Sequence, residues 1–428
     1  MVLYNTTVYI FSFLLLFPLG FFIARHGITD PLCKQYTTRL FTVCFSVYGL
    51  YMLLNYCVLI EDPLLDYWSD YLFFYEWAID LGKLDYRQII SEAFTEPKLR
   101  ELPLFACFNG LLVRTLTLTG LPLRDFGIPL MMPIIFLASL IPVFMCKTLH
   151  ALEFKIKEFG IPLYLFAFAT PLFFYSAYFY RDIFIYFTYV VLFYVLLTPR
   201  MQFRYLWIAL LLFLSWFLRM ENGMFACLFV ACFCFSKLKR YKLLLLIISG
   251  LIALGAFVLF YDTMLATLQR YNERSLSLAS NESLGKLFAT KIPFPLNYLF
   301  LTCFSQLLPF PCTMLLFKEL DNTWLQRITV IIPFFWTYIL IFIVSNWRFN
   351  KIPAHILYLF YASLLYLFLT SIAEINLRRQ MYVFPLFFFV YIHLTKDLPA
   401  HRKKRCFMIT ICSLLLLHCL YWGLKSFL

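Results

Sequence analysis

The sequence predicts an all-α fold, a polytopic bundle of transmembrane helices, on three observations. Of its 428 residues, 63% are hydrophobic and only 14% are charged, and the mean hydropathy is +0.80. Soluble domains are about 45–50% apolar and about 25% charged. A soluble fold with 52 Phe and 29 Tyr would also lack enough polar residues to cover its apolar side chains. Several apolar runs reach the roughly 20 residues that cross a bilayer core as a helix.

The apolar runs, taken in order, predict about 11–13 crossings. The candidate spans are 7–24, 40–60, 127–146, 159–178, 183–198, 204–218, 222–236, 243–261, 295–317, 328–345, 354–373, 380–395 and 407–424. We expect the whole chain, 1–428, to form a single integral membrane domain. The run 103–122 is apolar but contains Asn109 and Arg114, so a juxtamembrane or re-entrant helix suits it as well as a span does.

The charged residues between the runs orient the bundle. The tracts 25–39, 147–158, 199–204 and 237–242 are rich in Lys and Arg, and the positive-inside rule places them in the cytoplasm. The net charge of +13 therefore indicates membrane topology, and no nucleic-acid partner is predicted.

One segment, 61–102, has the opposite charge. It contains ten carboxylates against four Lys or Arg, and we expect it to be an extracytoplasmic acidic loop with juxtamembrane helices. The segment 262–293 is expected to be a second extracytoplasmic loop. Between 262 and 406 the topology stays open, because a cytoplasmic 396–405 requires a span count that these runs do not give. The three prolines of 294–317 are compatible with a hairpin that enters and leaves on one face.

The acidic segment contains the candidate catalytic carboxylates Asp62, Asp66 and Asp70. Asp70, Phe73/Phe74 and Trp77 have the spacing of one helix face, which would hold a carboxylate over aromatic rings. Such a carboxylate would act as a general base on an acceptor hydroxyl, or would hold a divalent cation against a diphosphate. The alternative is a solvated acidic loop that caps a helix.

Two further charged clusters lie where apolar runs meet, on the same predicted face as the acidic segment. Arg181 and Asp182 form a tight turn within an aromatic stretch, which is also typical of an interfacial aromatic belt. Arg219 and Glu221 form the second cluster. The guanidinium of Arg219 would clamp a phosphate, because its fork matches phosphate oxygens, although snorkelling to the interface explains its position equally well.

Arg378 and Arg379 form a fourth cluster, ahead of an apolar run that contains Pro385. They would bind an anion or mark a cytoplasmic tract.

The sequence has no Walker loop, no Gly-x-Gly-x-x-Gly, no Gly-x-Ser-x-Gly and no His-Glu-x-x-His. No Cys-x-x-Cys pair occurs, and no metal-ligating residues are assigned. An internal repeat is not evident, which disfavours a transporter.

Four stretches resemble recurring segments of the membrane-embedded GT-C glycosyltransferases and of bacterial repeat-unit polymerases. The acidic segment with SDYLFFYEWA (Ser69–Ala78) resembles the Asp-x-x-x-Tyr-x-x-x-Ala-like signature of the GT-C enzymes. FFYSAYFYRDIFIYF (Phe173–Phe187) and FLRMENGMF (Phe217–Phe225) are similar to recurring stretches of these proteins. RRQMYVFPLFFF (Arg378–Phe389) is similar to their late Arg-Tyr-x-x-Pro segment. The chain departs from the family by an extra N-terminal span and by the lack of a large C-terminal soluble domain.

The resemblance implies a role for the matching residues. Asp70 would activate the acceptor or bind a metal ion; because the acidic loop follows the second span, Asp62 and Asp66 remain alternatives. The substrate-binding set would neutralise or surround the lipid phosphate and comprises Arg181, Asp182, Arg219, Glu221, Arg378 and Arg379.

The function that the resemblance implies is transfer of a sugar from a polyprenyl-(di)phosphate-linked donor onto a glycan or lipid acceptor during surface-polysaccharide assembly. The expected location is the bacterial cytoplasmic membrane, where the chain would contact membrane lipid. Two alternatives remain open. One is an O-antigen or capsule repeat-unit polymerase that joins lipid-diphosphate-linked oligosaccharides, and the other is a flippase or transporter of lipid-linked glycans.

Overall fold

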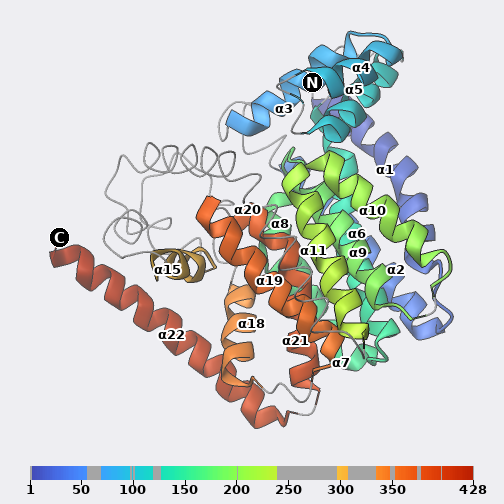
Figure 1. Ribbon diagram of the computed structural model, residues 1–428. Coiled ribbons are helices and arrows are strands. Elements are labelled where there is room, and N and C mark those ends of the chain that lie inside the picture. Colours follow the sequence, from blue (N-terminus) through green and yellow to red (C-terminus); the bar gives the residue numbers. More distant parts are fainter. Residues whose placement is uncertain are drawn as a thin grey trace. The chain divides into compact units, whose positions relative to one another are not determined.

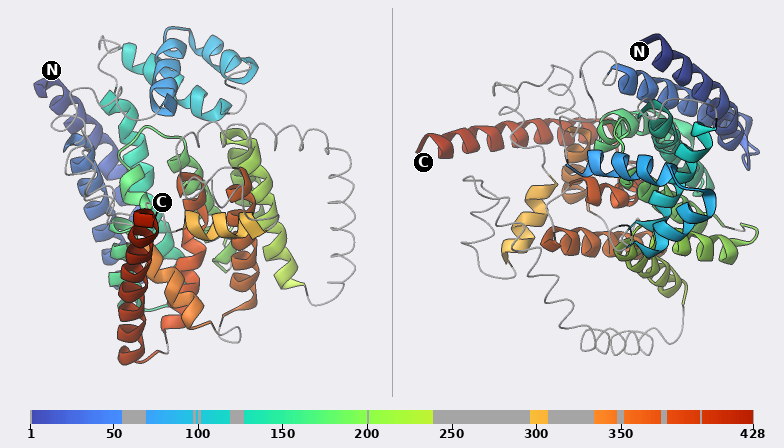
Figure 2. Two further views of the ribbon diagram at one scale, coloured as in Figure 1. Left: turned by 90° about the vertical axis from the view of Figure 1, so that its left-hand side faces the viewer. Right: turned by 90° about the horizontal axis from the view of Figure 1, so that it is seen from above.

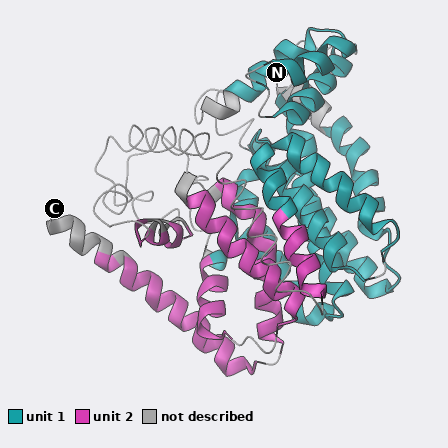
Figure 3. Cartoon of the chain, in the orientation of Figure 1, with its two compact units in different colours: residues 1–227, 315–336 teal, residues 228–314, 337–428 magenta. Residues whose placement is uncertain are grey.

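In the computed structural model of the chain, every regular element among the described residues is a helix (Figure 1), which confirms the predicted all-α class. The structure describes residues 2–54, 69–96, 99, 102–118, 127–199, 201–238, 296–306, 334–347, 352–373, 377–396 and 398–427. The chain divides into two compact units (Figure 3). Unit 1 comprises residues 1–227 and 315–336, and unit 2 comprises residues 228–314 and 337–428.

The helices of unit 1 are built around one central helix, α6. They are α1 (Val2–Arg25), α2 (Pro31–Leu54), α3 (Ser69–Gly82), α4 (Tyr86–Thr95), α5 (Pro103–Thr117), α6 (Gly127–Ala151), α7 (Ile156–Phe168), α8 (Pro171–Tyr175), α9 (Asp182–Leu197), α10 (Arg204–Leu218) and the first part of α11 (Met220–Lys237). Helix α6 packs against α1, α2, α7 and α9. A helix that is apolar on all sides is stable only when it is surrounded, and 83% of the most apolar window of α6 is buried.

Among the described residues, four helices are long and apolar enough to cross a membrane. They are α2, α6, α11 and the Ala354–Ser371 part of α19. Helices α9 and α10 are apolar but shorter. Apolar side chains also lie exposed along α1 and α10, among them Phe11, Leu14, Phe22, Leu206 and Phe213. Exposed apolar faces of this extent are typical of contact with lipid, and they agree with the membrane class that the composition predicts.

The expected span 159–178 is two helices instead of one. Helix α7 ends at Phe168, and Pro171 begins the short helix α8. A residue that precedes proline is disfavoured in the helical region, and Thr170 adopts an extended backbone with φ −135° and ψ 169°. The Tyr48 hydroxyl donates a hydrogen bond of 2.8 Å to the carbonyl oxygen of Ala167, which satisfies an acceptor that the broken helix leaves open.

A buried lysine closes the end of α1. The Nζ atom of Lys147, in α6, donates hydrogen bonds to the carbonyl oxygens of Ile23 (2.6 Å) and His26 (2.9 Å). The last carbonyls of a helix have no partner within the helix and carry partial negative charge, so a cation stabilises them. Lys147 therefore ties the end of α1 to the central helix.

Unit 2 contains the rest of α11, α15 (Leu296–Ser305), α18 (Phe334–Ser345) from Thr337 onward, α19 (Ala354–Ala373), α20 (Leu377–Gln380), the 3₁₀ turn η4 (Met381–Val383), α21 (Phe384–Thr395) and α22 (Ala400–Phe427). Helix α21 is almost wholly buried and packs against α19. Pro385 stands at the second position of α21, where its missing N–H removes no helical bond, so this proline begins the helix.

The helices α3, α4 and α5 pack against one another at one end of unit 1 (Figure 2). At 14, 10 and 15 residues they are too short to cross a bilayer core. Helix α4 begins with a capping box in which the Asp85 carboxylate accepts from the backbone N–H of Gln88 at 2.8 Å. The described part of the predicted acidic segment 61–102 is therefore largely helical, whereas the predicted loop 262–293 lies outside the described residues.

Candidate functional site

Four of the predicted site residues lie at one end of a helical hairpin in unit 1. Helix α9 begins at Asp182, and α10 returns beside it and ends at Leu218. The two helices have 16 and 15 residues, so at 1.5 Å per residue they are nearly equal in length. Because α10 runs back along α9, the end of α10 lies at the level where α9 begins. Arg181 and Asp182 therefore share this end of unit 1 with Arg219 and Glu221.

Arg181 and Asp182 are both buried where α9 begins. Arg181 is 8% exposed and Asp182 is 1% exposed. The Arg181 Cζ atom lies 5.7 Å from the centre of the Phe74 ring, a cation–π contact that joins the start of α9 to α3. Asp182 occupies the first turn of α9, where the positive end of the helix dipole favours a carboxylate.

Arg219 forms the link between α10 and α11. It is buried, and its Nη2 atom lies 2.8 Å from Oε2 of Glu221, whose side chain is 53% exposed. The pair thus joins a guanidinium inside the unit to a carboxylate at its surface. The chain changes direction here, because Arg219 has an extended backbone with φ −170° and ψ 120° between the two helices. Its N–H still donates to the carbonyl oxygen of Ser215, and its own carbonyl oxygen accepts from the N–H of Gly223.

The corner between α10 and α11 requires glycine at position 223. A Cβ atom added to Gly223 would lie 2.7 Å from the Cα atom of Trp216, a backbone atom that has no rotamer to change. The Tyr189 hydroxyl of α9 donates a hydrogen bond of 2.7 Å to the carbonyl oxygen of Asn222, next to this glycine. The turn that carries Arg219 and Glu221 is consequently held by packing on α10 and by a hydrogen bond from α9.

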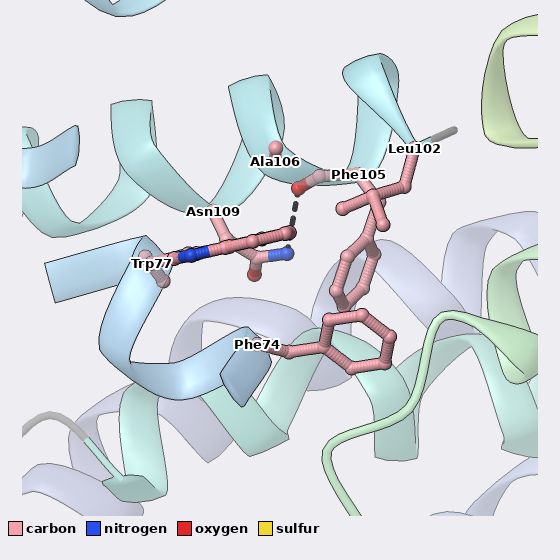
Figure 4. A pocket seen from close by; sticks show the side chains of 7 residues that line it. Phe74, Trp77, Leu102, Phe105, Ala106 and Asn109 are labelled. Atoms are coloured by element: carbon pink, nitrogen blue, oxygen red, sulfur yellow. Dashed lines mark hydrogen bonds between the residues drawn. The ribbon is translucent and has the colours of Figure 1, made fainter. Parts of the chain in front are cut away.

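The helices α3–α5 pack against this same end through aromatic side chains. The ring centres of Phe105 and Phe184 are 5.3 Å apart, which joins α5 to the first turn of α9. Phe94 of α4 lies 5.6 Å from Phe217, the residue two positions before Arg219. The short helices therefore contact both the Arg181 and the Arg219 sides of the site. Helices α3 and α5 meet at a seam that is lined by Phe74, Trp77, Phe105 and Asn109 and has no room for a water molecule (Figure 4).

Of the three predicted catalytic carboxylates, only Asp70 lies among the described residues. Asp70 is the second residue of α3, four residues before the Phe74 that contacts Arg181. One helical turn therefore separates the backbone of Asp70 from the residue in contact with the arginine. Asp62 and Asp66 lie outside the described residues. Within the described ranges, no group of three or more His, Cys, Asp or Glu side chains is arranged to hold a metal ion.

Arg378 and Arg379 belong to unit 2, where they form most of the four-residue helix α20. Arg378 is buried, and the carbonyl oxygen of Arg379 accepts a hydrogen bond of 2.7 Å from the Tyr366 hydroxyl. The next residue, Gln380, is fully buried and donates to the Ser371 hydroxyl at 3.0 Å; it also accepts a hydrogen bond from Gln306. The arginine pair is thus carried on a backbone that α19 holds in place.

Several of these supporting residues escape sequence analysis. Phe74 is one of two adjacent phenylalanines that the sequence pattern does not distinguish. In the structure Phe74 is buried, with 7% of its surface exposed, whereas Phe73 is 39% exposed. Tyr189 sits among many tyrosines of an apolar run and has no local signal. The amides Gln306 and Gln380 do have one, because a polar amide close to a membrane-spanning run implies a hydrogen-bond partner.

Two guanidiniums, Arg181 and Arg219, and the Asp182 carboxylate are buried at one end of an otherwise apolar bundle. Burying a charge is costly unless it is paired or hydrogen-bonded, so these groups need defined partners. Arginine presents a planar fork of N–H donors that matches the oxygens of a phosphate.

The comparisons with protein-family models, with curated proteins and with solved structures found no match for this chain.

Proposed function

We propose that this chain is a membrane-embedded glycosyltransferase that transfers a sugar from a polyprenyl-phosphate-linked donor to a glycan or lipid acceptor. The observation that carries the proposal is the burial of Arg181 and Arg219 at one end of the α9–α10 hairpin, beside the helix that contains Asp70. A donor with a polyprenyl tail lies in the bilayer, so its phosphate reaches an enzyme at the boundary between lipid and water.

The proposed step is a displacement at the anomeric carbon of the donor sugar. Asp70 accepts the proton of the acceptor hydroxyl, and the acceptor oxygen forms a bond to that carbon. The bond from the carbon to the phosphate oxygen breaks, and its electron pair leaves with the lipid phosphate. Arg181 and Arg219 offset the negative charge that develops on this leaving group, which lowers the barrier.

The position of Glu221 supports a role for Arg219 in this step. A buried arginine without a counter-charge would be costly before the donor binds, and the contact of 2.8 Å with Glu221 supplies one. Because the Glu221 side chain is half exposed, it can rotate away when a phosphate takes its place. We propose a location in the bacterial cytoplasmic membrane, with this end of unit 1 facing outward.

The first test is binding of radiolabelled polyprenyl phosphate to the full chain in nanodiscs. Arg181→Gln and Arg219→Gln should each weaken binding by about tenfold or more, since a hydrogen bond to a charged group contributes roughly 1.5–3 kcal/mol. The matched control is Arg39→Gln, because Arg39 is exposed on α2. Equal binding by all four proteins would refute the phosphate role of the two buried arginines.

The second test separates the proposed reaction from the repeat-unit polymerase. Transfer is followed from a polyprenyl-phosphate-linked radiolabelled hexose to membrane acceptors. Asp70→Asn should reduce transfer by about 10²–10⁴-fold while leaving polyprenyl phosphate binding intact. Full transfer by Asp70→Asn together with its loss in Arg219→Gln would reject the carboxylate mechanism and favour the polymerase. Movement of the lipid across the bilayer without transfer would favour the flippase.

A further inference from the structure

A second charged surface lies at one end of unit 2, far along the sequence from the residues of the proposed reaction. Helix α11 ends at Lys237, and its Phe233 ring lies 6.3 Å from His355 in the first turn of α19. Helices α19 and α21 are antiparallel, because Phe360 pairs with Phe387 at 4.7 Å and Tyr366 pairs with Tyr382 at 6.4 Å. The end of α21 therefore lies beside the start of α19.

The start of α22 meets the same end. The Nδ2 atom of Asn346, just after α18, lies 3.1 Å from the Sγ atom of Cys406. Phe342 of α18 in turn packs on Tyr391 of α21 at 5.0 Å. The ends of α18 and α21 and the beginning of α22 gather together in Figure 1. We call the exposed cations at this end the basic surface, which consists of Lys237, Lys396, Arg402, Lys403, Lys404 and Arg405.

The described part of unit 2 offers the basic surface no acidic counter-charge. The described residues of this unit include no Asp or Glu, and the sequence from 337 to 428 has only Glu374 and Asp397. None of the four cations from 402 to 405 forms an ion pair within the ranges that the structure describes. They also stand in the first turns of α22, where the helix dipole opposes positive charge. An external anion would relieve both kinds of repulsion.

The residues of α22 that come after the basic cluster indicate the source of that anion. Cys406 and Thr410 are buried against the unit, so α22 is fixed by one face. Phe407 packs on Tyr338 of α18 with 6.1 Å between the ring centres. Met408 and Ile409, just after the basic cluster, are exposed, and Leu415, Leu416 and Leu420 are exposed further along. A basic cluster that continues into an exposed apolar helix fits the boundary between head groups and acyl chains.

We propose that the basic surface binds the head groups of anionic phospholipids in the membrane leaflet at that end of unit 2. Basic residues also occur between the helices of unit 1, but there Asp30, Glu153 and Glu158 lie among them. Mixed charge of that kind attracts an anionic leaflet less. The inference does not depend on the reaction proposed for unit 1, and it assigns α22 a binding role in place of a purely topological one.

The test compares phosphatidylglycerol with phosphatidylcholine of identical acyl chains. Native mass spectrometry of the full chain in detergent gives the affinity for each lipid. The wild-type chain should prefer phosphatidylglycerol, and raising the salt concentration should weaken that preference alone. The variant in which Arg402, Lys403, Lys404 and Arg405 are all replaced by Gln should bind phosphatidylglycerol at least tenfold more weakly and phosphatidylcholine equally well.

The matched control removes the same charge from unit 1 by replacing exposed Arg25, Arg39, Lys155 and Lys157 with Gln. It should retain most of the preference. Equal loss in both variants, or no salt dependence in the wild-type chain, would overturn the proposal. Competition by free inorganic phosphate at the affinity of the lipid would overturn it as well, since the site would then recognise a soluble anion. The salt dependence remains decisive if the fourfold variant does not fold.

Discussion

The guanidinium of Arg181 lies over the ring of Phe74, with 5.7 Å between the Cζ atom and the ring centre. This contact joins the first residues of α9 to the short helix α3, 107 positions earlier in the sequence by residue number. It brings a buried cation close to the helix that contains Asp70. The proposed acceptor side and the proposed phosphate side of the reaction are therefore connected through one aromatic ring.

Replacing Phe74 by Leu tests this connection. Leu keeps an apolar side chain but has no ring face, so the variant should lose about 1–3 kcal/mol of unfolding free energy from packing and from the cation–π contact. The measurement is thermal or denaturant unfolding of the purified chain in detergent. The control is Phe73→Leu, because Phe73 is 39% exposed and should cost much less. Equal losses would show that Arg181 does not use the Phe74 ring.

Gly223→Ala tests the corner between α10 and α11. The added methyl group would lie 2.7 Å from the Cα atom of Trp216, so the backbone must move, at a cost of about 1–3 kcal/mol. Because the corner carries Arg219, binding of radiolabelled polyprenyl phosphate should also weaken. Gly160→Ala is the control, since its nearest neighbour would lie 3.4 Å away and α7 gains helix propensity. Unchanged stability and binding in Gly223→Ala would contradict the corner geometry.

Lys147→Met tests the cap on α1. Met has a similar length but cannot donate, so the carbonyl oxygens of Ile23 and His26 lose their partner. We expect a loss of about 1–3 kcal/mol. Hydrogen exchange should increase at the end of α1 before the rest of unit 1 is affected. Lys157→Met, at an exposed position, should leave both readouts unchanged. Exchange that rises uniformly across unit 1 would argue against a local cap.

Gln380→Leu tests the support beneath the arginine pair of unit 2. The change removes the hydrogen bonds to Ser371 and Gln306, and hydrogen bonds between membrane helices contribute about 0.6–2 kcal/mol each. The unfolding free energy should therefore fall by roughly 1–3 kcal/mol. Gln35→Leu on the exposed side of α2 is the control and should have little effect. A Gln380→Leu chain as stable as wild type would show that these bonds add nothing to the fold.

Much of the secondary structure is predictable from composition and from runs of apolar residues. The apolar runs at 127–146, 204–218 and 354–373 are helical, as α6, α10 and α19, and of these α6 and α19 contain windows long enough to cross a membrane. The exception at 159–178 has a local cause, because Pro171 ends one helix and begins another. The sequence does not predict which long run becomes the core, since α6 and α10 are both strongly apolar, yet one is buried and the other is largely exposed.

The sequence by itself determined that this is a helical chain with apolar, membrane-length segments, because the cost of exposing so many apolar side chains to water depends on composition alone. It also placed Arg181 and Arg219 at the ends of apolar runs. Only the tertiary structure decided that both are buried at one end of one hairpin, and that Phe74 rather than Phe73 meets Arg181. Such contacts arise from packing between helices far apart in the chain, and no local pattern of residues encodes which side chains will meet.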